Sequence, residues 1–271
     1  MGIIKTKGIV LLESNMGDFD KMVSILTPDL GKIGCAAKGA RKPKSPLLAG
    51  TQFLSFSDLV IFSGANSYNI NSCETIEVFY NIRTDLEKLT YASFISRLVY
   101  DVTDENQYTY KILQLLLNTL YLISETDQDK DFILSVFELR LMVLLGFAPT
   151  LGKCAICGEK NDIGYFSMNH NGFVCNACGR TDKSAIKISI DTFNALKYIA
   201  TAPAKKLFSF CRSLALNAFL RMQYRVSMLR ISLMLPYVFG LKREFLWYRT
   251  CKKMWGEGTA LNTGPQRFIR M

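Results

Sequence analysis

The 271-residue sequence predicts an α+β protein, in which a small closed β-barrel is followed by helices and a four-cysteine zinc ribbon. Three observations predict this class. Short apolar runs separated by turn residues fill about the first eighty residues, and after them the hydrophobic period changes from two to about 3.6. Two Cys-x-x-Cys pairs then occur with seventeen residues between them.

The barrel is predicted from five closely spaced apolar or alternating runs. Turn chemistry such as Gly17-Asp18 and Pro28-Asp29-Leu30-Gly31 separates them. A flat sheet of this size would leave its edges unpaired, so a closed barrel is the expected arrangement. The predicted strands are residues 7–13, 22–26, 32–37, 53–62 and 69–79.

Helical periodicity follows the barrel. The predicted helices are residues 85–102, 108–123, 130–146 and 191–200. Residues 132–145 are apolar on most faces, which predicts a buried central helix that Gly146 and Pro149 end. Asp191 or Thr192 is expected near the cap of the last of these helices.

The cysteine pairs have the spacing of a structural zinc ribbon, in which a hairpin brings two tight turns to one ion. The four predicted ligands are Cys154, Cys157, Cys175 and Cys178. Four sulfur ligands close a tetrahedron and leave no position open for catalysis, so the expected Zn²⁺ is structural. Redox-active pairs and chance spacing are the alternatives. Gly158, Gly172 and Gly179 are expected at positive-φ corners of the turns, and His170 at an exposed hairpin tip.

A basic loop between predicted barrel strands is the candidate nucleic-acid contact. Its four cations within seven residues are Lys38, Arg41, Lys42 and Lys44. Such a loop can present charge to a phosphate backbone, although a merely solvated turn has the same composition. The nearby aromatic residues are stacking faces or core residues, and the core is the commoner fate of each. They are Phe53, Phe56, Phe62 and Tyr68.

Composition excludes several classes of function. His170 is the only histidine, and no GxxxxGK[ST] loop occurs, so neither a Ser/His/Asp hydrolase nor a P-loop ATPase is expected. The remaining cysteines are scattered singly, which is typical of a reducing, cytoplasmic compartment. Apolar runs fall short of the roughly 18 residues that span a bilayer, so no membrane association is expected. Of the net charge of +10, residues 207–271 hold +9, eleven cations against two acids.

The ordered motifs resemble the RecO family of bacterial recombination mediators. The resemblance starts with Gly31-Lys-Ile33 and the run from Lys38 to Ser45, and it runs in order from about residue 5 to about residue 200. Its later motifs are Phe137-Glu-Leu-Arg-Leu141, Leu145-Gly-Phe-Ala-Pro149, Cys154-x-x-Cys157-Gly158, Tyr165-Phe-Ser167, Gly172 and Cys175-x-x-Cys178.

The resemblance implies an N-terminal OB-fold β-barrel followed by an α-helical domain with an inserted four-cysteine zinc ribbon. The implied domains are the DNA-binding barrel at 1–81, the helical domain at 82–150 and 186–240, and the ribbon at 151–185. Composition, rather than the resemblance, predicts an irregular basic tail at 241–271, which is rich in Gly, Arg and Lys. It also implies binding of single- and double-stranded DNA, with Lys38, Arg41, Lys42 and Lys44 as contacts, and annealing of complementary strands. The implied partners are RecR and single-stranded-DNA-binding protein, and through them RecA.

The leading hypothesis is therefore a cytoplasmic, nucleoid-associated DNA repair and recombination mediator that is not an enzyme. Two alternatives remain open. One is a zinc-ribbon adaptor for protein interactions whose basic loop does not touch DNA. The other is an RNA-binding factor without annealing activity.

Overall fold

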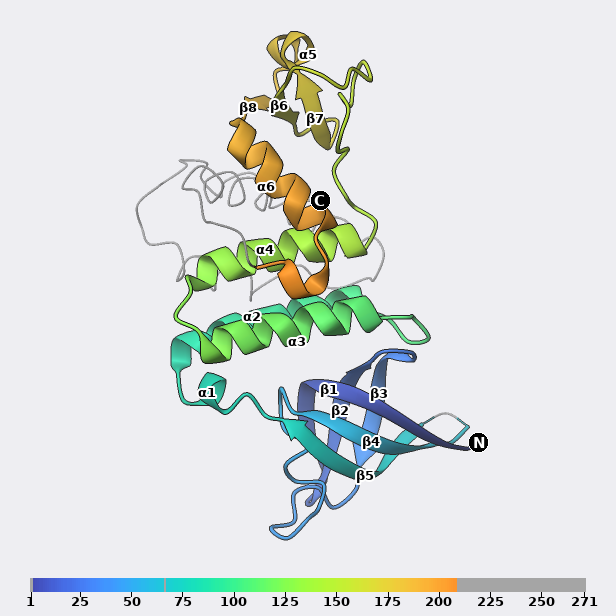
Figure 1. The fold of residues 1–271 in the computed structure, drawn as a ribbon. Coiled ribbons are helices and arrows are strands. Elements are labelled where there is room, and N and C mark those ends of the chain that lie inside the picture. Colours follow the sequence, from blue (N-terminus) through green and yellow to red (C-terminus); the bar gives the residue numbers. More distant parts are fainter. Residues whose placement is uncertain (1, 66, 209–271) are drawn as a thin grey trace, which may run out of the picture. The chain divides into compact units, whose positions relative to one another are not determined.

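The computed structural model describes residues 2–65 and 67–208 of the chain (Figure 1). The predicted basic tail at 241–271, and the part of the predicted helical domain after residue 208, lie outside the described residues. Within the described part the chain is of the mixed α+β class, as predicted, with strands first and helices after them.

Five strands form a closed barrel at the N-terminus, in the order β1-β2-β3-β5-β4, which is the strand order of an OB-fold. The strands are β1 Gly2–Met16, β2 Asp20–Thr27, β3 Gly31–Ala37, β4 Phe56–Ser63 and β5 Tyr68–Glu77. β1 is longer than predicted because it closes the barrel. Its first half pairs with β4 and its second half with β2, with an irregularity between Val10 and Leu12. β3 and β5 close the opposite side with a short parallel pairing.

Alternation along the strands fills the barrel with branched apolar side chains. Val23 and Ile25 of β2 point inward and are fully buried, whereas Met22, on the outer face of the same strand, is 40% exposed. Burying each of the large interior side chains contributes about 1.5–3 kcal/mol relative to exposure. The interior cluster comprises Val10, Val23, Ile25, Ile33, Cys35, Ala37, Ala40, Leu47, Leu59, Ile61 and Ile70.

The helices begin where the sequence supplies caps. They are α1 Tyr80–Arg83, α2 Leu86–Val102, α3 Tyr110–Glu125, α4 Lys130–Leu144 and α6 Ile190–Thr201. The Asp85 carboxylate accepts from the N–H groups of Glu87 and Lys88 and so begins α2. The cap of α6 is Ser189, whose hydroxyl accepts from the Thr192 N–H; Asp191 and Thr192 lie near the cap, in the first turn.

α4 is the buried central helix that its composition predicts. It packs against α3 and α6, and Ile133, Val136 and Phe137 are fully buried. Gly146 ends it with a φ of +90°, which only glycine adopts without strain. The N–H of Gly146 donates to Val143 O, and the N–H of Phe147 donates to Met142 O.

A small cysteine-bearing module lies between α4 and α6. It contains β6 Ile163–Ser167, β7 Gly172–Cys175, α5 Asn176–Thr181 and β8 Ala185–Lys187, and its sheet has the order β7-β6-β8. A short 3-10 turn, Ala204–Lys206, follows α6. None of the helices in the described ranges combines the length and apolar character needed to cross a bilayer.

Candidate functional site

The four predicted metal ligands converge on one point. The Sγ atoms of Cys154, Cys157, Cys175 and Cys178 all lie within 4.8 Å of one another, and those of Cys157 and Cys175 are 3.8 Å apart. A tetrahedral ion with Zn–S distances of about 2.3 Å places its sulfur ligands about 3.8 Å apart. The cluster therefore has the dimensions of a four-thiolate metal site.

The first pair lies on a tight turn before the hairpin. Gly158 closes the turn with a φ of +80°, and its N–H donates to Cys154 O at 3.0 Å. The N–H of Cys157 points at Cys154 Sγ, 3.5 Å away. This turn aims both thiols to the same side, as the sequence spacing predicts.

The second pair is positioned by a helix rather than by a turn. Cys175 ends β7 and caps α5, which carries Cys178. The expectation that Gly172 and Gly179 adopt positive φ was wrong, because neither has a left-handed backbone. Glycine is needed at both positions because there is no space for a side chain. A Cβ at Gly172 would lie 2.7 Å from Thr150 Cβ, and a Cβ at Gly179 would overlap the Tyr165 ring.

The pKa values of the Cys154 and Cys178 thiols are shifted in opposite directions by their surroundings. Burial opposes ionisation of Cys154, but backbone N–H groups of Cys157, Cys175 and Ile156 outweigh it and lower its pKa to about 6. Hydrogen bonding to the Cys175 thiol raises the pKa of Cys178 to about 12. A bound cation would override the raised pKa of Cys178, since a thiol that coordinates a metal ion is deprotonated outright. Among the described residues, His170 lies exposed between β6 and β7, as predicted, outside the thiol cluster.

The four predicted DNA contacts lie together in the connection from β3 to β4, and the side chains of all four are exposed: Lys38, Arg41, Lys42 and Lys44. Consecutive turns tie this loop together. The N–H of Lys42 donates to Gly39 O at 3.1 Å, and the N–H of Ser45 donates to Lys42 O at 2.9 Å. Ala40 and Leu47 anchor the loop by inserting into the barrel core.

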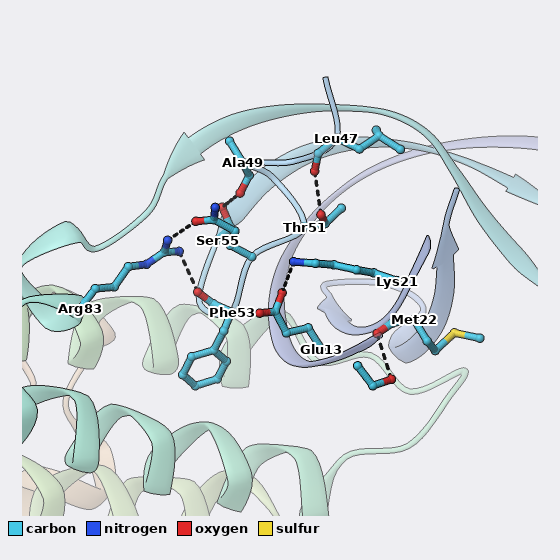
Figure 2. Close-up of polar contacts among 11 residues, drawn as sticks. Glu13, Lys21, Met22, Leu47, Ala49, Thr51, Phe53, Ser55 and Arg83 are labelled. Atoms are coloured by element: carbon cyan, nitrogen blue, oxygen red, sulfur yellow. Dashed lines mark hydrogen bonds and ion pairs between the residues drawn. The ribbon is translucent and has the colours of Figure 1, made fainter. Parts of the chain in front are cut away.

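The far end of this connection is held by internal hydrogen bonds and is fastened to α1 (Figure 2). The hydroxyl of Thr51 donates to Leu47 O at 2.7 Å, and that of Ser55 donates to Ala49 O at 2.9 Å. Arg83 donates to Phe53 O at 2.8 Å. The cations are thus presented from an ordered base, which reduces the conformational entropy lost when a ligand binds.

Two protein-family models match the chain. The one described as "Recombination protein O N terminal" matches residues 1–79, and the one described as "Recombination protein O C terminal" matches residues 83–217. The chain belongs to the RecO family. The resemblance in the sequence motifs is therefore confirmed.

Several members of the RecO family are similar to this chain over most of its length. The DNA repair protein RecO of Acetivibrio thermocellus is 47% identical over 78% of this chain and 84% of its own. The DNA repair protein RecO of Alkaliphilus metalliredigens is 40% identical over 73% of this chain and 80% of its own. That of Caldanaerobacter subterraneus subsp. tengcongensis is 34% identical over 76% and 84%.

In this RecO chain the aromatic residues near the basic loop differ from those the sequence singled out. Phe53 and Phe56 are half-buried, Tyr68 packs against the barrel core, and only Phe62 of the four is exposed. The aromatic residue beside the cations is Phe19, whose ring centroid lies 5.8 Å from Lys42 Nζ. Its one signal in the sequence is a large apolar residue inside the turn Gly17-Asp18-Phe19-Asp20.

Proposed function

We propose that this protein is a non-enzymatic mediator of DNA repair and recombination. In this proposal it binds single- and double-stranded DNA, anneals complementary strands and, together with RecR, helps to load RecA onto DNA coated with single-stranded-DNA-binding protein. Membership of the RecO family, whose similar members are named DNA repair proteins, supports the repair role. Its place of action in this proposal is the cytoplasm, at the nucleoid.

The observation that carries the proposal is the ordered basic loop on a closed barrel. Lys38, Arg41, Lys42 and Lys44 hold four positive charges within seven residues, all exposed. Two DNA strands repel each other through their phosphates, and cations that replace condensed counterions reduce that repulsion. A protein can therefore promote annealing without making or breaking a covalent bond.

We further propose that the four-cysteine cluster holds a structural Zn²⁺, with Cys154, Cys157, Cys175 and Cys178 as ligands. Thiolate donors select soft or borderline ions, and the 3.8 Å separation of Cys157 Sγ and Cys175 Sγ suits a tetrahedral zinc. When bound, the ion would cross-link the turn at 154–158 to the β7–α5 junction. With all four positions filled by sulfur, its role would be stability.

The domain limits remain part of the same proposal. The barrel would end at residue 81, and the helical domain would be interrupted by the zinc module at 151–185. Two other functions compete with the mediator role: an adaptor whose basic loop does not touch DNA, and an RNA-binding factor without annealing activity. Neither is favoured by a particular contact of the described residues.

The direct test is fluorescence-monitored annealing of two complementary oligonucleotides, one of them coated with single-stranded-DNA-binding protein. Wild type should accelerate annealing, and the variant with alanine at Lys38, Arg41, Lys42 and Lys44 should not. Equal acceleration by both would move the DNA contacts elsewhere. If folded, zinc-loaded wild type does not accelerate annealing, the mediator proposal is refuted and the adaptor hypothesis takes its place.

A further inference from the structure

An open pocket lies where the β1–β2 turn meets the basic loop. Its volume is about 450 Å³, and it is the hollow that brings an aromatic ring and cations together. Its lining residues are Asp18, Phe19, Asp20, Lys38, Gly39 and Lys42. Two separate segments of the barrel therefore build one concave surface.

Phe19 exposes a large apolar surface in this hollow. Its side chain is 52% exposed although it belongs to the most hydrophobic class of residues. Lys42 Nζ lies 5.8 Å from the ring centroid, within the range of a cation–π contact. An accessible ring beside a cation matches the two parts of a nucleotide, a flat base and a charged phosphate.

The backbone that carries the ring is fixed by hydrogen bonds between the two segments. The N–H of Arg41 donates to Phe19 O at 2.9 Å, and the Arg41 guanidinium donates to Gly17 O at 3.2 Å. The Asp20 carboxylate accepts from the N–H of Gly39 at 2.7 Å. Because the turn and the loop are locked together, the platform exists before a ligand arrives, and little ordering accompanies binding.

Within the described part of the chain, the outer face of β2 and β3 next to Phe19 carries small or flexible side chains. Met22 is 40% exposed and pairs with Ala36, and Ser24 pairs with Gly34 in the next row. These outward-facing positions of β2 and β3 are small or flexible, which leaves room for a strand of nucleic acid to pass over the sheet.

The charges around the hollow set the direction of the ligand. Asp18 and Asp20 line the hollow together with Lys38 and Lys42, so the charges of the lining sum to two minus two, or zero. Arg41 and Lys44 belong to the same loop outside the lining and bring the sum over the hollow and the loop to +2. Asp20 is engaged by Gly39 N–H, and Asp18 lies on the turn side. A phosphate is therefore accommodated on the side of Lys38 and Lys42, with its base over the ring.

We propose that Phe19 is a stacking platform for an unpaired base of single-stranded DNA, with Lys38 and Lys42 holding the adjacent phosphate; this rests on the proposed function of the basic loop. Base faces are free in a single strand and covered by neighbouring pairs in a duplex. Phe19 therefore favours single strands over duplex, whereas the loop cations bind both.

The test compares Phe19→Ala with wild type in fluorescence anisotropy, using oligo-dT of about 16 nucleotides and a duplex of the same length. Loss of one stacked base lowers single-strand affinity about 5- to 150-fold, while duplex affinity stays within about twofold. The slope of log affinity against log salt is unchanged, because no charge is removed. Phe147→Ala is the matched control: this phenylalanine is 57% exposed, against 52% for Phe19, and follows α4 outside the barrel, so its loss should leave both affinities unchanged.

A second variant reports stacking directly. Phe19→Trp retains binding, and its added fluorescence, relative to the parent protein with Trp247 and Trp255, is quenched by oligo-dT. Unchanged single-strand affinity in a folded Phe19→Ala protein, or an equal loss for single strand and duplex, overturns the platform while the loop proposal stands. Absence of any DNA binding by wild type refutes the proposed function itself, and the platform with it.

Discussion

Replacing the four cations of the basic loop by alanine should weaken DNA binding in a salt-dependent way. Each cation that contacts a phosphate of single-stranded DNA contributes about −0.7 to the slope of log affinity against log salt. Lys38, Arg41, Lys42 and Lys44 are all exposed, and Arg41 retains further N–H donors beside the one given to Gly17 O. The slope should therefore become shallower by about 2.8.

The assay is anisotropy of a labelled oligo-dT over a range of salt concentrations. A slope contribution of about −2.8 corresponds to about 50-fold of affinity between about 50 and 200 mM salt. The matched control removes one arginine and three lysines elsewhere in the described chain, all exposed: Lys111, Arg180, Lys187 and Lys197. A slope that changes by less than about one unit, or by the same amount in the control, would refute the assignment of phosphate contacts to the loop.

Three further predictions concern stability. Cys154→Ser should release the bound metal, detected with a chromogenic chelator, and should lower the unfolding midpoint, because metal binding is coupled to folding. Gly172→Ala should cost about 1–3 kcal/mol in urea unfolding, because its Cβ would lie 2.7 Å from Thr150 Cβ; Gly34→Ala is the control, with nothing within 4 Å. Hydrogen bonds from the Lys88 and Glu87 N–H groups lower the pKa of Asp85. The contribution of Asp85 to folding stability is therefore complete above its unfolded pKa and is lost as pH falls through its folded pKa. Asp85→Asn should reduce the fall in melting temperature at acid pH.

Each of these three predictions has its own contradicting result. Wild-type protein that folds normally without any metal would refute the zinc site. Equal stability of the Gly172 and Gly34 variants would show that Thr150 moves aside at little cost. An unchanged acid limb in the Asp85 variant would assign that pH dependence to other carboxylates.

The sequence determined the features that depend on local spacing. Alternating apolar residues placed the strands, and helical periodicity placed α2, α3, α4 and α6 to within a few residues. The two Cys-x-x-Cys pairs predicted the gathering of four thiols because a hairpin of seventeen intervening residues returns the chain on itself. The sequence also predicted that the four cations lie in a loop, since glycine and proline exclude that segment from regular structure.

The tertiary structure alone decided the features that depend on long-range register. Pairing of β1 with β4 and of β3 with β5 closes the barrel, and no local pattern specifies which strand meets which. Barrel closure also turned Tyr68 toward the core and brought Phe19 to Lys42, twenty-three residues further along the chain. Position 172 requires glycine because Thr150, twenty-two residues earlier in the sequence, packs against it. Such contacts arise from packing between distant segments, so they become visible only when the fold is known.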